Sequence, residues 1–206
     1  MSDLLAQVPV TRLPPDGHYG PAGTEGVRAR ALEGLAAATL AARKGGTGAL
    51  IARLAAAGLP LVDGPRALFQ EGLTVLGTGP GRWLVFAENT TGPALLARLR
   101  ALAGDDVALT DQSDANVVFE LTGPAVREAL AKGVALDLDP RAFAPGDVAT
   151  TVVSHVGVTL WACEAAREGA PPYRLAVARS FAPALLRWLT PGAAPFGLAL
   201  SGTSRG

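Results

Sequence analysis

Residues 117–147 constrain the fold of this chain more than any other segment. An apolar run at 117–121 has the length and composition of a β-strand, and a helical pattern follows it almost at once. Pro124 suits the first position of that helix, where its missing N–H is no loss, and either Thr122 or the glycine after it can cap the free backbone donors. Gly133 favours a left-handed backbone that ends the helix. The segment therefore predicts a strand that leads directly into a helix.

The expected helix has one apolar face. Val126, Ala129 and Leu130 recur at the spacing of one side of a helix, so we expect them to cover a sheet. Glu128 lies on the other side, four residues before Lys132, which is the favourable order for an ion pair. The pattern predicts that Leu130 is buried and that Glu128 faces solvent.

The rest of the chain alternates between strand and helix patterns. Apolar and β-branched runs mark the strands, and glycine and proline mark the boundaries between elements. This alternation favours an α+β fold in which helices cover a sheet. The predicted strands are 37–43, 72–77, 83–87, 107–110, 116–121, 148–154, 157–163 and 173–178, and the predicted helices are 47–57, 93–103, 124–132 and 181–189.

The two ends of the chain depart from this pattern. Residues 1–30 are dense in proline and glycine, so we expect an extended arm without regular elements. We expect one α+β body at 31–190, with 31–105 and 106–190 as possible units. The tail at 191–206 is again rich in glycine, proline and serine, and either covers an edge or lies loose.

A short internal echo suggests that the body has two similar halves. The tetrapeptide TGPA occurs at 91–94 and again at 122–125, each time between a strand pattern and a helix pattern. A chain rich in alanine and glycine can also produce four such residues by chance. If the echo marks a duplication, each half is a sheet with helices on one face, the split β-α-β (ferredoxin-like) arrangement.

Several segments resemble the gamma subunit of heterotetrameric sarcosine oxidase. They are LTGPAVREALAKGVALDLDPRAFAPGDV, YRLAVARSFAPALLRWL, ATLAARKGG and LGTGPGRWLVFAE, and together they span roughly residues 32–190. The chain departs from the family pattern at Val134 and Ala135, where Cys-Pro is usual, and at Asp139, where His is usual. These departures put any role of those family positions in doubt here.

The resemblance implies a fold and a set of partners. The fold is an α+β body of two intimately packed units, related to the folate-binding fold of the glycine-cleavage T-protein. Sarcosine oxidases of this kind demethylate sarcosine to glycine with oxygen, form hydrogen peroxide, and pass the methyl carbon to tetrahydrofolate. FAD, FMN, NAD and tetrahydrofolate belong to the larger subunits, so the resemblance implies no cofactor on this chain and a structural role in the assembly.

Composition limits the remaining function classes. Lys and Arg number 18, and Asp and Glu also number 18, so the formal charge is zero and no nucleic-acid or anionic-membrane footprint is expected. The only cysteine, Cys163, leaves no internal disulfide, and His18 and His155 are too few for a metal cage. Without a targeting or membrane-spanning pattern, a cytoplasmic location is expected.

Candidate catalytic motifs have simpler structural explanations. Residues 77–81, GTGPG, resemble a phosphate loop only in glycine content, and a hairpin turn explains them. Ser113 with Asp111 and His155 could form a hydrolytic triad on paper, but no GxSxG motif is present and turn-forming residues account for the cluster. We expect no catalytic residue. Core packing is also the simplest interpretation of Cys163 and of the three tryptophans, Trp83, Trp161 and Trp188.

Two other functions stay open from the sequence. A free-standing folate-binding protein of the same fold needs an acidic residue aimed at the pterin, for which Asp111, Asp114 and Glu120 are candidates. The Lys-Gly-Cys-x-x-Gly-Gln type motif of that relative is missing. A complex that oxidises another N-methylated amine is equally compatible, because the substrate pocket would lie on another chain.

Three residues are predicted to contact a larger subunit. Tyr19 lies in the proline-rich arm, and Arg141 and Phe143 lie on a proline-punctuated connection where neither has an evident local partner. Arginine and aromatic residues are favoured at interface centres, and a restricted loop loses less entropy on docking. The other expected apolar anchors of the arm are Leu4, Leu5, Val8 and Leu13.

Overall fold

The structure is a computed structural model that describes residues 12–105, 107–164 and 171–203. The chain divides into two compact units. We call residues 34–116 and 146–149 the central unit, and residues 1–33, 117–145 and 150–206 the terminal unit. The terminal unit therefore combines the beginning of the chain with most of its second half.

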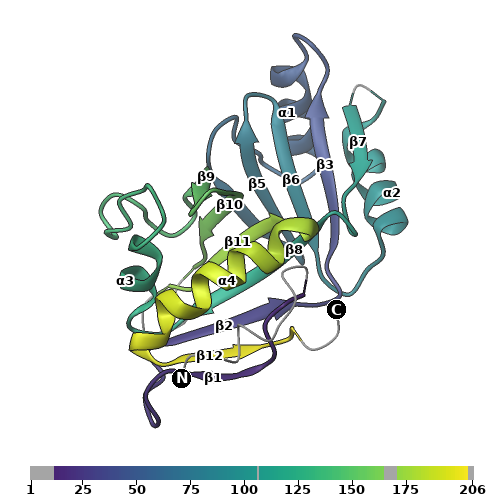
Figure 1. The fold of residues 1–206 in the computed structure, drawn as a ribbon. Helices are drawn as coiled ribbons and strands as arrows, with labels where there is room; N and C mark the ends of the chain where they lie inside the picture. The colour runs from purple at the N-terminus through teal and green to yellow at the C-terminus, as the bar shows by residue number, and fades with distance from the viewer. Residues whose placement is uncertain (1–11, 106, 165–170, 204–206) are drawn as a thin grey trace. The chain divides into compact units, whose positions relative to one another are not determined.

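The central unit is an antiparallel sheet with two helices on one face (Figure 1). Its strands lie in the order β4-β5-β6-β3-β7. The chain order β3-α1-β5-β6-α2-β7 is that of a split β-α-β unit, and β4 adds an edge strand. The elements are β3 Ala36–Ala42, α1 Thr47–Ala56, β4 Ala67–Gln70, β5 Leu73–Gly79, β6 Arg82–Ala87, α2 Gly92–Ala103 and β7 Val107–Asp111.

Leucines at helical spacing fasten both helices of the central unit. Leu50 and Leu54 of α1, and Leu95 and Leu99 of α2, are almost fully buried in one apolar cluster with the inner face of the sheet. Gly58 takes a φ of +86° just after α1, which agrees with the predicted end of this helix at residue 57. The apolar side of each helix therefore packs against the same face of the sheet.

The terminal unit repeats this plan in a larger sheet. Its strands lie in the order β1-β12-β2-β8-β11-β10-β9. The chain order β8-α3-β10-β11-α4-β12 matches that of the central unit, with β9 as the added edge strand and β2 inserted between β8 and β12. The elements are β1 Gly17–Tyr19, β2 Val27–Leu32, β8 Asn116–Thr122, α3 Val126–Ala131, β9 Val148–Val153, β10 Val156–Ala162, β11 Tyr173–Ala178, a 3-10 turn Arg179–Phe181, α4 Ala182–Ala193, a 3-10 turn Ala194–Phe196 and β12 Leu198–Ser201.

Both ends of the chain contribute strands, contrary to the irregular arm and tail expected from sequence. β12 pairs in parallel with β2 and antiparallel with β1, so the two ends complete one sheet. Asp16 fixes the pairing further, because its carboxylate accepts hydrogen bonds from the Thr203 amide at 2.7 Å and hydroxyl at 2.6 Å. The sequence analysis did not predict these strands. The segments are rich in proline and glycine, and the strands with which they pair lie far away in sequence.

The helix α3 confirms the predicted face but not its predicted ends. Val126 and Leu130 are buried and Glu128 is exposed. The helix begins at Val126 and has no side-chain cap, whereas Pro124 lies in the preceding turn. Gly133 does not have a positive φ; a Cβ there would lie 2.4 Å from the Trp188 ring. Close approach of α4, and not a left-handed stop, therefore explains this glycine.

The TGPA echo does not mark equivalent positions. Thr91 caps α2, the second helix of the central unit, and its hydroxyl accepts a hydrogen bond from the Ala94 amide at 3.4 Å. Thr122 ends β8, before α3, which is the first helix of the terminal unit. Gly123 there has a φ of +114° and approaches the Gly26 carbonyl. The fold repeats, but these four residues are not the trace of that repeat.

Candidate functional site

The loop between α3 and β9 is held by its own hydrogen bonds. The Asp139 carboxylate accepts from the Arg141 amide at 2.9 Å and from the Arg141 Nε at 2.8 Å. The Asp139 carbonyl accepts from the amides of Ala142 and Phe143, both at 2.8 Å. The Asp139 amide donates to Asp137 Oδ1 at 2.9 Å. Because these groups satisfy one another, the loop conformation is set within the chain.

Phe143 is an internal anchor of this loop. Its side chain is 7% exposed, and its ring stacks on Tyr173 of β11 with centroids 6.4 Å apart and an angle of 18° between the planes. Tyr173 in turn donates a hydrogen bond to the Leu138 carbonyl at 3.4 Å, and burial raises its pKa. The expectation that Phe143 lacks a local partner was wrong, because its partner lies thirty residues further along the chain.

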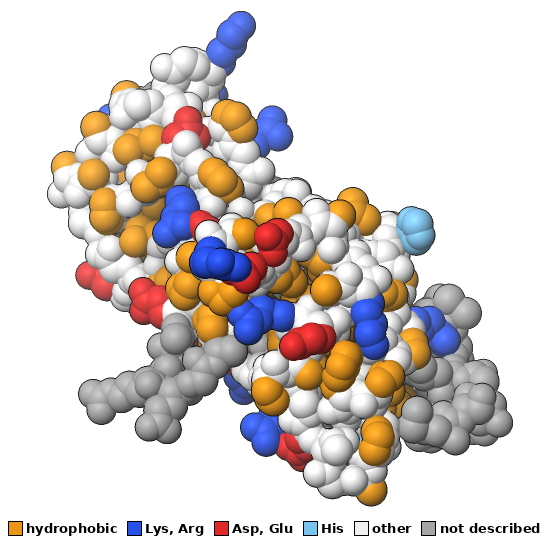
Figure 2. All heavy atoms as spheres, turned by 90° about the vertical axis from the view of Figure 1, so that its left-hand side faces the viewer, with side chains coloured by type: hydrophobic (Ala, Val, Ile, Leu, Met, Phe, Trp, Pro, Cys, Tyr) orange, Lys and Arg blue, Asp and Glu red, His pale blue; other side chains and the backbone are white. Residues whose placement is uncertain are grey.

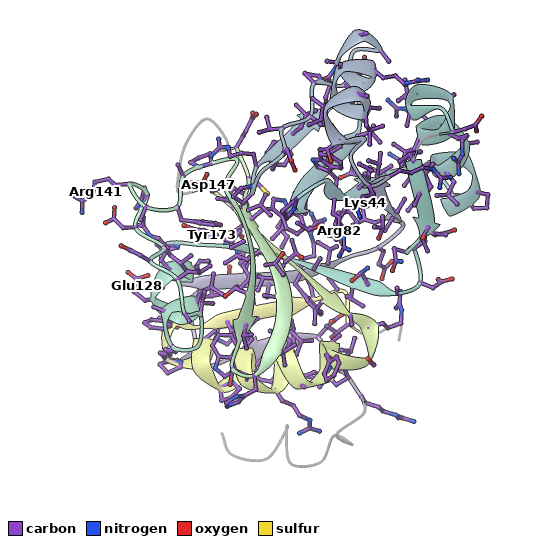
Figure 3. All side chains as sticks on the ribbon, turned by 90° about the horizontal axis from the view of Figure 1, so that it is seen from above. Lys44, Arg82, Glu128, Arg141, Asp147 and Tyr173 are labelled. Carbon is purple, nitrogen blue, oxygen red and sulfur yellow. The ribbon has the colours of Figure 1, made fainter. Side chains whose placement is uncertain are left out.

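Arg141 points away from the same loop (Figure 3). Its side chain is 92% exposed and forms an ion pair with Asp139 at 2.8 Å, so it too has a local partner. The hydrogen bond lowers the pKa of Asp139 and raises the pKa of Arg141. The guanidinium is oriented by Asp139 and remains open to a second acceptor.

Tyr19 is packed within the terminal unit. Its side chain is 8% exposed, and its hydroxyl donates a hydrogen bond to the Pro15 carbonyl at 2.7 Å. Burial, with the nearby Asp16 carboxylate, raises its pKa. The expected anchors Leu4, Leu5 and Val8 lie outside the described residues.

The three expected contact residues do not lie together. Tyr19 is on the edge strand β1, and the sheet order places β12, β2 and β8 between it and β11, the strand on which Phe143 packs. Of the three side chains, only that of Arg141 is exposed. A partner surface that contains Arg141 therefore includes Phe143 as support and not as a direct contact.

The glycine-rich segment at 77–81 ends β5 and forms the hairpin turn before β6, as predicted. It joins β5 to β6, and the Gly81 amide donates to Asp63 Oδ1 at 2.7 Å. Gly77 faces the Gly64 carbonyl so closely that a Cβ would lie 1.8 Å from it. A carboxylate already occupies the turn amide, and its charge would repel a phosphate.

Ser113 and Asp111 also form a turn. The Ser113 hydroxyl donates to Asp111 Oδ1 at 2.7 Å, and it accepts a hydrogen bond from the Ala37 amide at 3.0 Å. The bond from Ser113 lowers the pKa of Asp111. His155 belongs to the other unit and occupies the β9–β10 turn with a φ of +78°. These interactions account for the polar cluster without catalysis.

Glu120 is locked between two arginines on adjacent strands. It accepts bonds from Arg174 Nε at 2.8 Å and Nη2 at 2.7 Å, and from Arg30 at 3.0 Å. Burial raises its pKa, but the hydrogen bonds and charges of Arg174 and Arg30 outweigh burial and lower it overall. Both carboxylate oxygens are used, so Glu120 joins β2, β8 and β11 and is not directed at a ligand.

The remaining candidates have structural roles. Burial raises the pKa of Cys163 to about 11, which disfavours a thiolate nucleophile. Trp83 and Trp161 are each 1% exposed, and Trp83 Nε1 donates to the Val62 carbonyl at 2.9 Å. Within the described part of the chain, no group of three or more His, Cys, Asp or Glu residues could hold a metal. No helix among those residues is long and apolar enough to cross a bilayer.

The surface in Figure 2 carries charges of both signs between apolar side chains, without a stripe of one sign. Another apolar surface lies on α4, whose Trp188 the sequence analysis assigned to the core. Its outward side, together with the 3-10 turn before it, exposes Phe181 and Ala184 and half-exposes Trp188. The signal was present in SFAPALLRWLTPGAAPF, which contains one charged residue, Arg187. A helix that is apolar all round is typically buried against something on every side.

The fold and site together define a class. This is an α+β protein of two split β-α-β units, in which the polar groups around Gly81, Ser113 and Glu120 are occupied by hydrogen bonds within the protein. The model of the sarcosine oxidase gamma subunit family matches residues 50–195. The chain belongs to the sarcosine oxidase gamma subunit family.

Individual relatives agree with this assignment. Sarcosine oxidase subunit gamma from Corynebacterium sp. (strain U-96) is 33% identical over 162 residues, which cover 78% of this chain and 76% of the relative. Sarcosine oxidase subunit gamma from Arthrobacter sp. is 34% identical over 168 residues, covering 78% and 81%. The chain therefore spans most of the length of these relatives.

Two solved structures share the fold. One chain of the heterotetrameric sarcosine oxidase from Corynebacterium sp. U-96, in complex with pyrrole 2-carboxylate, matches with a TM-score of 0.71 at 31% identity, over 86% of this chain and 88% of that chain. The glycine cleavage system aminomethyltransferase T from Bartonella henselae matches with a TM-score of 0.60 at 15% identity, over 87% and 48%. The predicted α+β fold related to the T-protein is confirmed.

Proposed function

We propose that this chain is the gamma subunit of a heterotetrameric sarcosine oxidase and that it contributes to assembly and not to the chemistry. The observation that carries the proposal is the match to the heterotetrameric oxidase, at 31% identity over 86% of this chain. The internal pairing of Glu120, Asp111 and Ser113 supports a non-catalytic role. Cytoplasmic location is part of the proposal.

The chemistry is assigned to the larger subunits. Oxidative demethylation of sarcosine needs flavin, and transfer of the methyl carbon needs tetrahydrofolate. FAD, FMN and tetrahydrofolate are therefore proposed to bind to the larger subunits, together with the NAD that the family resemblance implies. The occupied turn amide at Gly81 supports this assignment, because a phosphate would have to displace Asp63. The substrate is proposed to be sarcosine, with another N-methylated amine as the alternative.

Reconstitution tests the proposal. The chain is co-expressed with the larger subunits of a heterotetrameric sarcosine oxidase, and sarcosine turnover is measured with and without it. We expect the purified oxidase to contain this chain, and the isolated chain to show no flavin spectrum and no turnover. Failure to co-purify with those subunits, or sarcosine oxidation by the isolated chain, would overturn the proposal.

Arg141 is the proposed contact within the loop between α3 and β9. Its 92% exposed guanidinium is already oriented by Asp139, so docking would cost it little entropy. We expect Arg141→Ala to weaken co-purification without changing the melting temperature of the isolated chain. Arg98→Ala is the matched control, because Arg98 is also an ion-paired surface arginine, 3.2 Å from Glu71. Equal retention of both variants by the larger subunits would refute the contact.

A further inference from the structure

The helix α4 has two apolar faces. Its inner face is buried and includes Leu185, Leu186 and Leu189. The opposite side presents residues spaced by three and four positions, which is the spacing of one helix face. We call this set, which begins and ends in the 3-10 turns on either side of α4, the outer α4 strip: Phe181, Ala184, Trp188, Pro191 and Pro195.

The outer α4 strip is unlike the outer faces of the other long helices. Phe181 is 55% exposed, although fully burying such a ring stabilises a protein by about 1.5–3 kcal/mol. α1 and α2 present mainly alanine and arginine outward, such as Ala52, Arg53 and Arg98. In Figure 1 α4 crosses one side of its sheet, so its outer side faces away from the strands.

Trp188 is held in place at the centre of the strip. A Cβ on Gly133 would lie 2.4–2.8 Å from three atoms of the indole, so the ring rests on the bare backbone at the end of α3. The side chain is half-buried, which leaves part of the indole at the surface. Tryptophan and arginine are the residues most enriched in interface hot spots, and Arg187 is adjacent.

The charge around the strip indicates what covers it. Residues 179–196, which form α4 and the 3-10 turns at its two ends, contain Arg179 and Arg187 and no acidic residue. The neighbouring helix α3 contributes one exposed carboxylate, Glu128, and one exposed cation, Lys132. The α4 segment therefore adds only positive charge to an apolar strip, which is complementary to an apolar surface with acidic residues at its margin.

A second copy of this chain is a poor occupant. A two-fold interface joins the same patch on both copies, so two outer α4 strips would bring Arg179 and Arg187 of each copy together without an acidic residue from this segment. A different protein with acidic groups avoids that repulsion. The proposed function supplies such a partner.

We propose that the outer α4 strip is the docking surface for a larger subunit of the oxidase, which presents an apolar surface bordered by acidic residues. This proposal rests on the proposed function and adds to it the surface of contact. Phe181 and Trp188 enter the partner, and Ala184 lets its backbone approach closely.

The test uses the co-expressed complex with an affinity tag on a larger subunit. Phe181→Glu and Ala184→Glu each place a carboxylate on the strip at an exposed position. We expect both to reduce the affinity of this chain for the complex at least about tenfold, a loss within the range of hot-spot residues. Ala184→Arg should reduce the affinity less than Ala184→Glu. Both side chains are larger than alanine, but the arginine is attracted to acidic residues of the partner and the glutamate is repelled by them.

Val62→Glu is the matched control. Val62 is 58% exposed, close to the 55% of Phe181, and belongs to the central unit. We expect this variant to assemble as the original chain does. Melting of each isolated variant within a few degrees of the original chain shows that its fold is intact, and Ala184→Glu provides a second reading if Phe181→Glu fails to fold.

The outcomes separate the two proposals. If the original chain does not assemble with the larger subunits, the proposed function fails. If it assembles and both strip variants assemble equally well, only the docking surface is wrong. Equal loss with Val62→Glu, or an isolated dimer that Phe181→Glu dissociates, also overturns the docking surface.

Discussion

The central and terminal units share one plan but complete it differently. In the central unit β7 pairs directly with β3, and nearly all of the unit comes from one continuous stretch of chain. In the terminal unit β2 is inserted between β8 and β12, and β1 adds beyond β12. The terminal sheet therefore depends on residues from opposite ends of the chain.

This difference explains which elements the sequence revealed. Apart from β4, which was not predicted, the elements of the central unit are bounded by local signals, such as Gly58 after α1 and Thr91 before α2. β1 and β12 are only three and four residues long, and their register comes from each other and from β2. Short strands without a local turn carry too little periodicity to be recognised.

The largest expected effect is loss of the terminal sheet when β12 is removed. Deletion of residues 198–206 takes away the buried Leu198 and Leu200, which together contribute about 3–6 kcal/mol. We expect hydrogen exchange to show loss of protection in β2 and β8, whereas β5 and β6 keep theirs. Equal loss in all four strands would mean that the two units unfold as one.

Core leucines in equivalent helices should cost about the same. Leu130 of α3 and Leu54 of α1 lie in the first helix of each unit, and both are 0% exposed. Each change to alanine should destabilise by about 2–5 kcal/mol in denaturant unfolding. Glu128→Ala, on the exposed face of α3, should cost less than about 0.5 kcal/mol. A similar shift for Leu130→Ala and Glu128→Ala would show that the wrong face of α3 has been assigned to the core.

The inserted strand β2 is tied to its neighbours by charge as well as by backbone. Glu120→Gln weakens the bonds to Arg30 and Arg174, and should cost about 1.5–3 kcal/mol at pH 7, as expected for hydrogen bonds to charged groups. Glu120 has a pKa below its ordinary value of 4.5, so its contribution is present above that value and is lost as pH falls through the lowered pKa. The difference in stability between the original chain and the Glu120→Gln variant should therefore shrink below pH 4.5.

Thermal unfolding across pH measures this effect. Glu25→Gln is the control, because Glu25 pairs with Arg28 where both side chains are more than half exposed, at 51% and 65%. Its change should be small at every pH. A Glu120→Gln difference that persists unchanged at pH 2 would assign the effect to packing and not to charge.

The candidate site was less predictable than the fold. The sequence correctly indicated that GTGPG is a turn and that Trp83 and Trp161 are core residues. It could not show that Phe143 stacks on Tyr173, because that contact joins distant segments. The outer face of α4 was detectable in principle from its lack of charge, but apolar residues around a whole helix do not by themselves tell a second face from a core.

The smallest expected effects concern the ends of the second helices, which the two units stabilise by different means. In α2 the cation lies in the last turn, where Arg100 donates to the carbonyls of Gly104 at 3.4 Å and Val107 at 3.2 Å. The last turn of α4 has no basic residue. Lys132, at the end of α3, instead donates to the Gly192 carbonyl at 2.5 Å and lies 4.5 Å from the centre of the Phe196 ring.

Because cations are favourable at the negative end of a helix, Arg100→Met and Lys132→Met should each cost about 0.3–1 kcal/mol. The loss should be somewhat greater for Lys132, since an exposed cation–π contact adds about 0.5–1 kcal/mol. Melting temperatures would show shifts of about 1–4 °C for Arg100→Met and about 2–8 °C for Lys132→Met in a chain of this size. Lys44→Met, on an exposed loop of the central unit, is the control for loss of a lysine charge. If Lys132→Met melts like that control while Arg100→Met does not, the contact between α3 and the end of α4 contributes nothing, and the terminal unit closes its second helix by burial alone.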